Sequence, residues 1–170
     1  RILYTQYAQQ PSNDARIERK SGAGAGVKVT GTYGGPLTIQ GNVIAGNRGA
    51  FWGGGMCFDR AAGTVQKNRI VANHAKLHGG AVSILVRSSV QSFVGGDHGA
   101  MWGVFDNDIR GNSDGVFELA MARFGGEQAV LVSHCNLSDN VGKTFVNHTK
   151  NKVLAADNWW GTTDVKLIGG

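Results

Sequence analysis

Apolar and polar positions alternate in short stretches that recur along the chain, each built around asparagine. Four segments align on this pattern: TIQGNVIAGN (38–47), TVQKNRIVAN (64–73), GVFDNDIRGN (103–112) and LVSHCNLSDN (131–140). Each contains an aliphatic residue, Asn three residues later, a second aliphatic residue two further on, and a second Asn after three more. The fourth copy has Cys135 at the first-Asn position. Period-two alternation of this length predicts a short β-strand on each side of the first Asn.

The segment LAADNWWGTTD is a fifth, partial copy with Asn158 at the first-Asn position and Trp160 at the aliphatic one. The first-Asn positions are Asn42, Asn68, Asn107, Cys135 and Asn158, so the steps are 26, 39, 28 and 23 residues. Three steps have the length of one turn of a β-solenoid. The step of 39 requires an additional loop, which we place within 88–100.

Glycine corners precede a third β-prone stretch in several copies. Gly53-Gly54-Gly55 comes before Met56, Gly79-Gly80 before Ala81, and Gly115 before Val116. A coil therefore has three short strands: one after the glycines, one before the first Asn and one after it. A single coil cannot bury its apolar face, whereas stacked coils pair strand on strand, with equivalent residues about 4.8 Å apart.

We therefore predict an all-β fold, a single-stranded right-handed parallel β-helix of about five coils; right-handed connection is the rule for parallel strands. The first-Asn positions Asn42, Asn68, Asn107, Cys135 and Asn158 are expected to form a ladder, because stacked amides can bond to one another. We also expect Asn to take the left-handed backbone conformation of the corner. The alternative is a β-sandwich, but its hairpins favour Asn-Gly turns, and here glycine precedes asparagine.

Three regions follow from the extent of the repeat. Residues 1–35 do not match it and are expected to form an N-terminal cap or a junction to further coils, since the ends of repeat proteins need covering. Residues 36–161 form the β-helix, and residues 162–170 form a C-terminal tail. No stretch is apolar for long enough to predict a transmembrane segment.

The pattern G-G-G-[IM] followed by I-x-x-N-x-I-x-x-N resembles bacterial right-handed parallel β-helix repeat proteins. Ala156-Asp157-Asn158-Trp159-Trp160-Gly161 is similar to the A-x-N-N-W-W-G sequence that closes the last coil of secreted members. The resemblance covers about 36–161 and implies an extracellular or cell-surface protein. Members include polysaccharide lyases and hydrolases, adhesins and surface proteins, so the fold does not choose among functions.

Composition narrows the possible partners. The chain has 27 glycines but only 2 prolines among 170 residues, and 41% of its residues are hydrophobic. These values argue against collagen and against disorder, and they agree with many tight corners. A net charge of +5 favours acidic partners. We expect a polysaccharide, a cell-surface glycan or other protein subunits as partners, and no nucleic acid.

Asp106, Asp108 and Arg110 are the candidate catalytic residues. A polysaccharide lyase of this fold uses carboxylates that hold Ca²⁺ and an Arg or Lys base. The two aspartates flank Asn107, so both are expected to project outward. They belong to one coil, however, and Lys67, Arg69 and Ser133 occupy equivalent positions nearby, which favours a solvated outer face. No cofactor is expected, apart from Ca²⁺ if the protein is a lyase.

Trp52 and Trp102 are the candidate ligand-binding residues, because they lie in similar contexts and aromatic faces stack on sugar rings. The alternative is that both cover the side of the tube. Trp159 and Trp160 are expected to close the C-terminal end. His74 and His78 have a spacing that binds metal on a helix, but no helix is expected here, so no metal site is predicted.

The leading hypothesis for the function is an exported or cell-surface structural or adhesive module that binds glycans or assembles with other subunits. Its basis is a regular repeat without an acidic cluster spanning several coils. The alternative is a polysaccharide lyase or glycoside hydrolase, or part of one, acting on acidic glycans. Convergence of carboxylates from two adjacent coils with Arg or Lys would favour the enzyme.

Overall fold

The computed structural model describes residues 26–30, 37–59, 63–77, 79–85, 102–113, 117–120, 130–141, 143–147 and 153–164. Within these ranges the regular structure consists of thirteen β-strands, and there is no helix. Every pairing between these strands is parallel. The described part of the chain is therefore all-β and consists of parallel sheets, as the sequence predicts.

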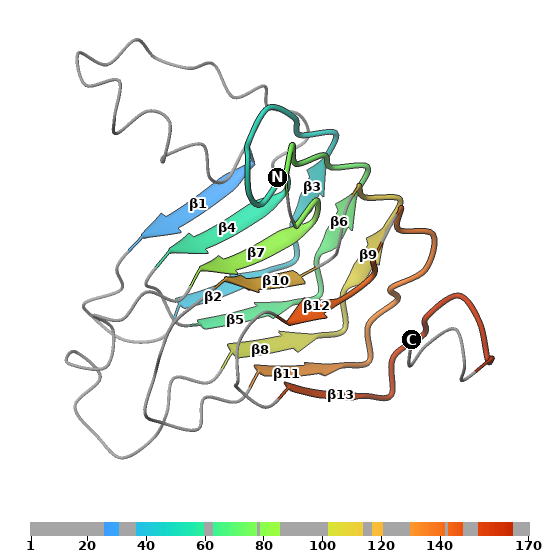
Figure 1. The fold of residues 1–170 in the computed structure, drawn as a ribbon. Coiled ribbons are helices and arrows are strands. Elements are labelled where there is room, and N and C mark those ends of the chain that lie inside the picture. Colours follow the sequence, from blue (N-terminus) through green and yellow to red (C-terminus); the bar gives the residue numbers. More distant parts are fainter. Residues whose placement is uncertain are drawn as a thin grey trace, which may run out of the picture.

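The strands form three sheets (Figure 1). The first contains β1 (Val27–Thr30), β4 (Met56–Asp59), β7 (Val82–Leu85), β10 (Phe117–Ala120) and β12 (Val146–Asn147), in that order. The second contains β2 (Leu37–Gln40), β5 (Gly63–Gln66), β8 (Trp102–Phe105), β11 (Val130–Ser133) and β13 (Val153–Ala156). The third contains β3 (Val43–Ala45), β6 (Arg69–Val71) and β9 (Asp108–Arg110).

Strands β1 to β9 visit the three sheets in turn, so the first three repeats each place one strand in every sheet, and the last two repeats place strands in the first and second sheets. The predicted three strands of a repeat are thus confirmed in the first three repeats, with one strand on each side of the first Asn and one in the first sheet. In the last two repeats, bridges between Asp108 and Asn136 and between Asn136 and Trp159 continue the third sheet. This arrangement is compatible with a β-helix-like fold.

The expected boundaries fall partly on described residues. β1 lies inside the segment 1–35, yet it pairs in register with β4 and so adds a strand to the first sheet. Residues 1–25, 86–101 and 165–170 lie outside the described residues. They include most of the expected cap, the expected loop at 88–100 and most of the expected tail.

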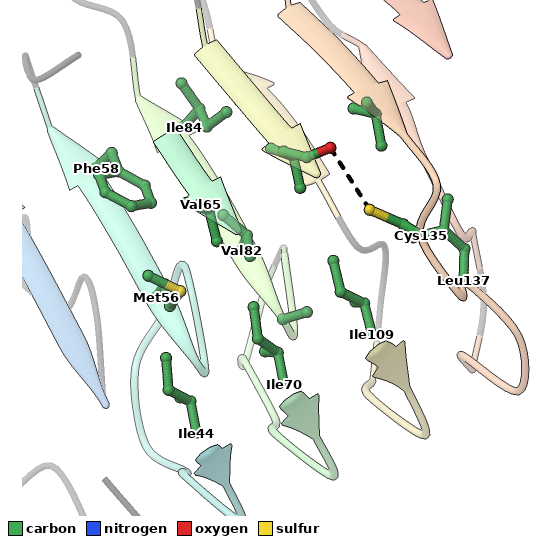
Figure 2. Packing of buried hydrophobic residues seen from close by; sticks show 13 residues of the cluster. Ile44, Met56, Phe58, Val65, Ile70, Val82, Ile84, Ile109, Cys135 and Leu137 are labelled. Atoms are coloured by element: carbon green, nitrogen blue, oxygen red, sulfur yellow. Dashed lines mark hydrogen bonds between the residues drawn. The ribbon is translucent and has the colours of Figure 1, made fainter. Parts of the chain in front are cut away.

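The core is filled by apolar side chains from all three sheets (Figure 2). Ile44, Ile70 and Ile109 are paired in register in the third sheet and are fully buried. Met56 and Phe58 of β4 project toward them from the first sheet (Figure 2). Because side chains alternate along a strand, the aliphatic positions on each side of the first Asn reach this core. In the first sheet Cys57 and Ser83, which alternate with core residues, are buried as well.

Glycine at the corner before the first-sheet strands lets consecutive repeats approach closely. A Cβ atom on Gly80 would collide with the carbonyl oxygen of Ser113, one repeat further along. A Cβ atom on Gly54 would lie 2.6 Å from the carbonyl oxygen of Gly80. These corners therefore require glycine because of the backbone of the next repeat.

The left-handed backbone falls on the residue before each asparagine, and not on the asparagine as expected. Before the first-Asn positions the φ angles are 69° at Gly41, 53° at Lys67, and 55° at Asp106, His134 and Asp157. Before the second Asn they are 68° at Gly46, 54° at Ala72, 63° at Gly111 and 58° at Asp139. The preceding residue makes the bend, which leaves the asparagine amide directed at its neighbours.

Candidate functional site

The first-Asn positions form the predicted ladder. The backbone N–H of Asn42 donates to Oδ1 of Asn68 at 2.9 Å, and Nδ2 of Asn42 donates to the same oxygen at 3.2 Å. Asn68 donates to Oδ1 of Asn107 in the same way, at 2.9 and 3.1 Å. Asn68 and Asn107 are buried, so these bonds satisfy polar groups that water does not reach.

Cys135 takes the place of asparagine in this ladder and still contacts the ladder residues on both sides. Its sulfur lies 3.9 Å from Nδ2 of Asn107, and its backbone N–H donates to Oδ1 of Asn158 at 3.0 Å. Its thiol also lies 3.5 Å from the carbonyl oxygen of Val104 (Figure 2). Burial raises the pKa of the Cys135 thiol; hydrogen bonds from the backbone and side chain of Asn107 oppose the rise, and the charge of Asp106 adds to it.

The second-Asn positions form another ladder, which the sequence pattern contained but which was not predicted. Asn47 donates to Oδ1 of Asn73 from its backbone and side chain at 3.1 and 2.8 Å. The same pair of bonds joins Asn73 to Asn112 and Asn112 to Asn140. The equal spacing of the two Asn positions in each repeat was the signal for it.

Two of the three candidate catalytic residues, Asp108 and Arg110, form a surface ion-pair row with Arg69. Nε of Arg110 lies 2.9 Å from Oδ1 of Asp108, and Nε of Arg69 lies 3.7 Å from Oδ2. Asn136, one repeat further on, donates to Oδ1 of Asp108 at 3.1 Å. Asp106 is exposed at its left-handed corner, and no described contact joins it to Asp108 or Arg110. Asp108 thus has two cationic neighbours, Arg110 from its own strand and Arg69 from the preceding repeat, instead of a second carboxylate.

The two C-terminal tryptophans lie differently. Trp160 packs against the core cluster, which agrees with its expected role at the end of the stack. Trp159 follows Asn136 in the outward-facing row of the third sheet and is 50% exposed. It therefore does not close the end as expected.

The structure describes one of the two candidate binding tryptophans in full. Trp52 is partly buried, and its ring lies 6.2 Å from that of Phe51 at an interplanar angle of 50°. Nζ of Lys76, from the next repeat, lies 5.2 Å from the Phe51 ring centre. Trp102 begins β8 in register with Gly63 and Val130, and its side chain lies outside the described residues. The contact between Lys76 and Phe51 was not predicted. The repeat length gave a signal for it, because a step of 26 residues from Phe51 leads to Leu77, which is next to Lys76.

The described residues hold no group of three or more His, Cys, Asp or Glu side chains that could bind a metal ion. His74 is exposed, and His78 lies outside the described residues. Among the described residues, no helix is long and apolar enough to cross a membrane.

Comparison of the chain with protein-family models, with curated proteins and with solved structures finds no match. The resemblance to β-helix repeat proteins thus rests on the motifs themselves, and the function has to be argued from the contacts.

Proposed function

We propose that the repeats are coils of a right-handed parallel β-helix, and that this β-helix serves as a structural or adhesive module outside the cell. The cyclic visiting of three parallel sheets and the shared core support the β-helix. Right-handed connection between parallel strands is the strong default. The likeness of Asn158-Trp159-Trp160-Gly161 to the closing sequence of secreted members supports export.

The observation that carries the proposal is the use of polar side chains to join one repeat to the next. Two asparagine ladders do so in the interior. On the surface, Nε2 of Gln66 donates to Oε1 of Gln40 at 2.8 Å, and Asn136 donates to Asp108. Polar groups in these positions stabilise the stack and hold its outer rows in place, which is what a scaffold requires.

The alternative of a lyase is less well supported by this geometry. A lyase base must face its substrate, whereas Nε of Arg110 lies 2.9 Å from the Asp108 carboxylate and is engaged in that ion pair. The Asp108 carboxylate is shared between Arg69 and Arg110, so its charge is balanced. Asp106 contributes no second carboxylate to this row.

A panel of immobilised polysaccharides tests the proposal. The purified chain is passed over neutral and acidic polysaccharides, and retention is measured together with released reducing ends and unsaturated uronate products. An adhesive module is retained on at least one polysaccharide and releases no product, whereas a purely structural module is not retained and releases none. Release of product that disappears in Asp108→Asn would identify an enzyme and overturn the proposal.

A further inference from the structure

We propose that a basic-aromatic corner formed by two adjacent repeats binds a negatively charged sugar, carrying sulfate or carboxylate groups. This corner consists of Arg48, Phe51, Trp52, His74, Lys76 and Leu77. The inference rests on the proposed function, since it names the class of glycan that an adhesive module would hold. It assigns a location outside the ion-pair row of Asp108.

Backbone hydrogen bonds hold the two halves of the corner side by side. The N–H of His74 donates to the carbonyl oxygen of Asn47 at 2.8 Å. The N–H groups of Lys76 and Leu77 donate to the carbonyl oxygens of Ala50 and Phe51 at 2.8 and 3.0 Å. The second asparagine ladder fixes the start of both segments. The side chains are therefore presented from a backbone that is already ordered, which lowers the entropic cost of binding.

The side chains of the corner combine aromatic surface with positive charge. Lys76 extends over the face of Phe51, whose ring is tilted against that of Trp52. Arg48, His74 and Lys76 are exposed, and Leu77 is 47% exposed. A cation beside an aromatic face can bind an anionic group while the ring packs on the C–H face of the sugar.

Charge complementarity selects an anionic ligand. Residues 46–58 and 71–85, which include both segments, contain no Asp or Glu. Among the described residues no ion pair joins Arg48 or Lys76 to a carboxylate, whereas Asp108 pairs with Arg69 and Arg110. Arg48 offers a planar fork of donors that suits sulfate and carboxylate alike. A nucleic acid is less favoured, because sequence-independent strand binding stacks successive bases on several aromatic faces, and here two tilted rings are partly buried.

Binding of a heparin oligosaccharide and of an oligogalacturonate tests the inference, with a neutral dextran as the reference. Comparison of the two anionic ligands distinguishes sulfate from carboxylate, because the oligogalacturonate carries carboxylate groups and no sulfate. Arg48→Gln and Lys76→Gln are each expected to weaken binding roughly five- to tenfold, and Trp52→Ala by about tenfold or more, as the loss of single charged or stacking contacts implies. Lys76→Arg should restore binding, and Lys143→Gln, an equal loss of exposed charge on a later repeat, should leave it unchanged.

Binding of the anionic sugars should also weaken with added salt, because exposed charges are screened. Equal affinity for dextran and heparin, or an equal loss in Lys143→Gln, would overturn the inference while leaving an adhesive module intact. Tighter binding of a single-stranded oligonucleotide than of either sugar would assign the corner to nucleic acid instead. Because Arg48 and Lys76 are exposed, their Gln variants test the inference even if Trp52→Ala does not fold.

Discussion

At the scale of single residues, one left-handed residue and the ladder residue that follows it form a unit that repeats nine times, with Cys135 in place of asparagine in one copy. The residue before each ladder position makes the bend, and the asparagine then donates twice to the next repeat. The two have different chemical requirements. The bend favours glycine, whereas the ladder position requires a side chain that both donates and accepts.

Asn112 lies in the interior of one ladder and Asn42 at the end of the other, so variants of the two residues compare these positions. Asn112 is buried and accepts two bonds from Asn73 while its own Nδ2 donates to the carbonyl oxygen of Ile70. Asn112→Ala leaves these partners unsatisfied and is expected to cost about 3 kcal/mol or more of unfolding free energy, at about 1–3 kcal/mol for each buried group. Asn42→Ala should cost about 1 kcal/mol. Urea denaturation measures both, and equal costs would contradict a role for the ladder.

Ala72 is the one alanine among the left-handed residues, with φ of 54° and an exposed side chain. The left-handed conformation costs alanine about 1–2 kcal/mol, and glycine gives back roughly 0.5–1 kcal/mol in the unfolded chain. Ala72→Gly is thus expected to stabilise the protein by about 0.5–1 kcal/mol. The matched variant Ala45→Gly, in strand β3, should destabilise it by a similar amount. Thermal and urea unfolding of the pair would disprove the assignment if both variants were destabilised.

Cys135 is expected to lower the free energy of unfolding at alkaline pH. Burial raises the pKa of its thiol above the usual value of about 8.5 in the unfolded chain. The folded state therefore favours the neutral thiol, so this contribution is complete below the unfolded pKa and is lost as the pH rises through the folded pKa. Cys135→Asn removes the titration and restores an amide rung.

The Asn variant is accordingly expected to keep more of its stability above about pH 9 than the parent chain does, a range set by the ordinary thiol pKa. Unfolding free energies measured from pH 7 to pH 10 provide the comparison. Parallel curves for the parent and Cys135→Asn would show that the thiol does not titrate on unfolding.

At the scale of the strands, the spacing between repeats is set by corners as much as by hydrogen bonds. Gly80→Ala places a methyl group against the backbone of Ser113, and the cost of such overpacking is expected at the upper end of about 1–3 kcal/mol. Gly41→Ala meets nothing within 4 Å and should lose only about 1–2 kcal/mol through its φ angle. Denaturant midpoints of the two variants check this order, and the reverse order would contradict it.

The strands of the repeat could be predicted from the sequence, whereas the surface contacts could not. Alternation around Asn42, Asn68 and Asn107 is sufficient to place the second- and third-sheet strands, because the aliphatic positions must reach one core. The left-handed bend was predicted at Asn because Asn tolerates that conformation. The structure has the bend at the preceding residue, and the Asn amide bonds to the neighbouring repeats. The ion pair of Asp108 with Arg69 depends on which residues stack across a step of 39, and spacing alone gives no side-chain direction.

At the scale of the whole molecule, each described strand is hydrogen-bonded only to strands of the preceding and the following repeat. β5 and β8 of the second sheet are paired on both sides, whereas β13 pairs only with β11 among the described strands. Stability in such a stack is nearly a sum over repeats and the interfaces between them. The end of the stack should therefore open more readily than its middle.

Native-state hydrogen exchange tests this gradient. The amides of β5 and β8 are expected to exchange at least about tenfold more slowly than those of β13, which corresponds to about 1.4 kcal/mol in opening free energy. Peptide-level exchange followed by mass spectrometry resolves these segments. Uniform protection along the second sheet would show that the described repeats unfold as a single cooperative unit.

The ladders have one more consequence, which concerns how such a chain can change over evolutionary time. Asn68 donates to Asn107 across 39 residues with bonds of 2.9 and 3.1 Å, and Asn42 donates to Asn68 across 26 residues with bonds of 2.9 and 3.2 Å. The geometry of the ladder hydrogen bonds therefore does not depend on the number of residues between the two asparagines. Insertions and deletions can accumulate in the connections while every rung keeps its partner, so new surface features can arise without a new scaffold.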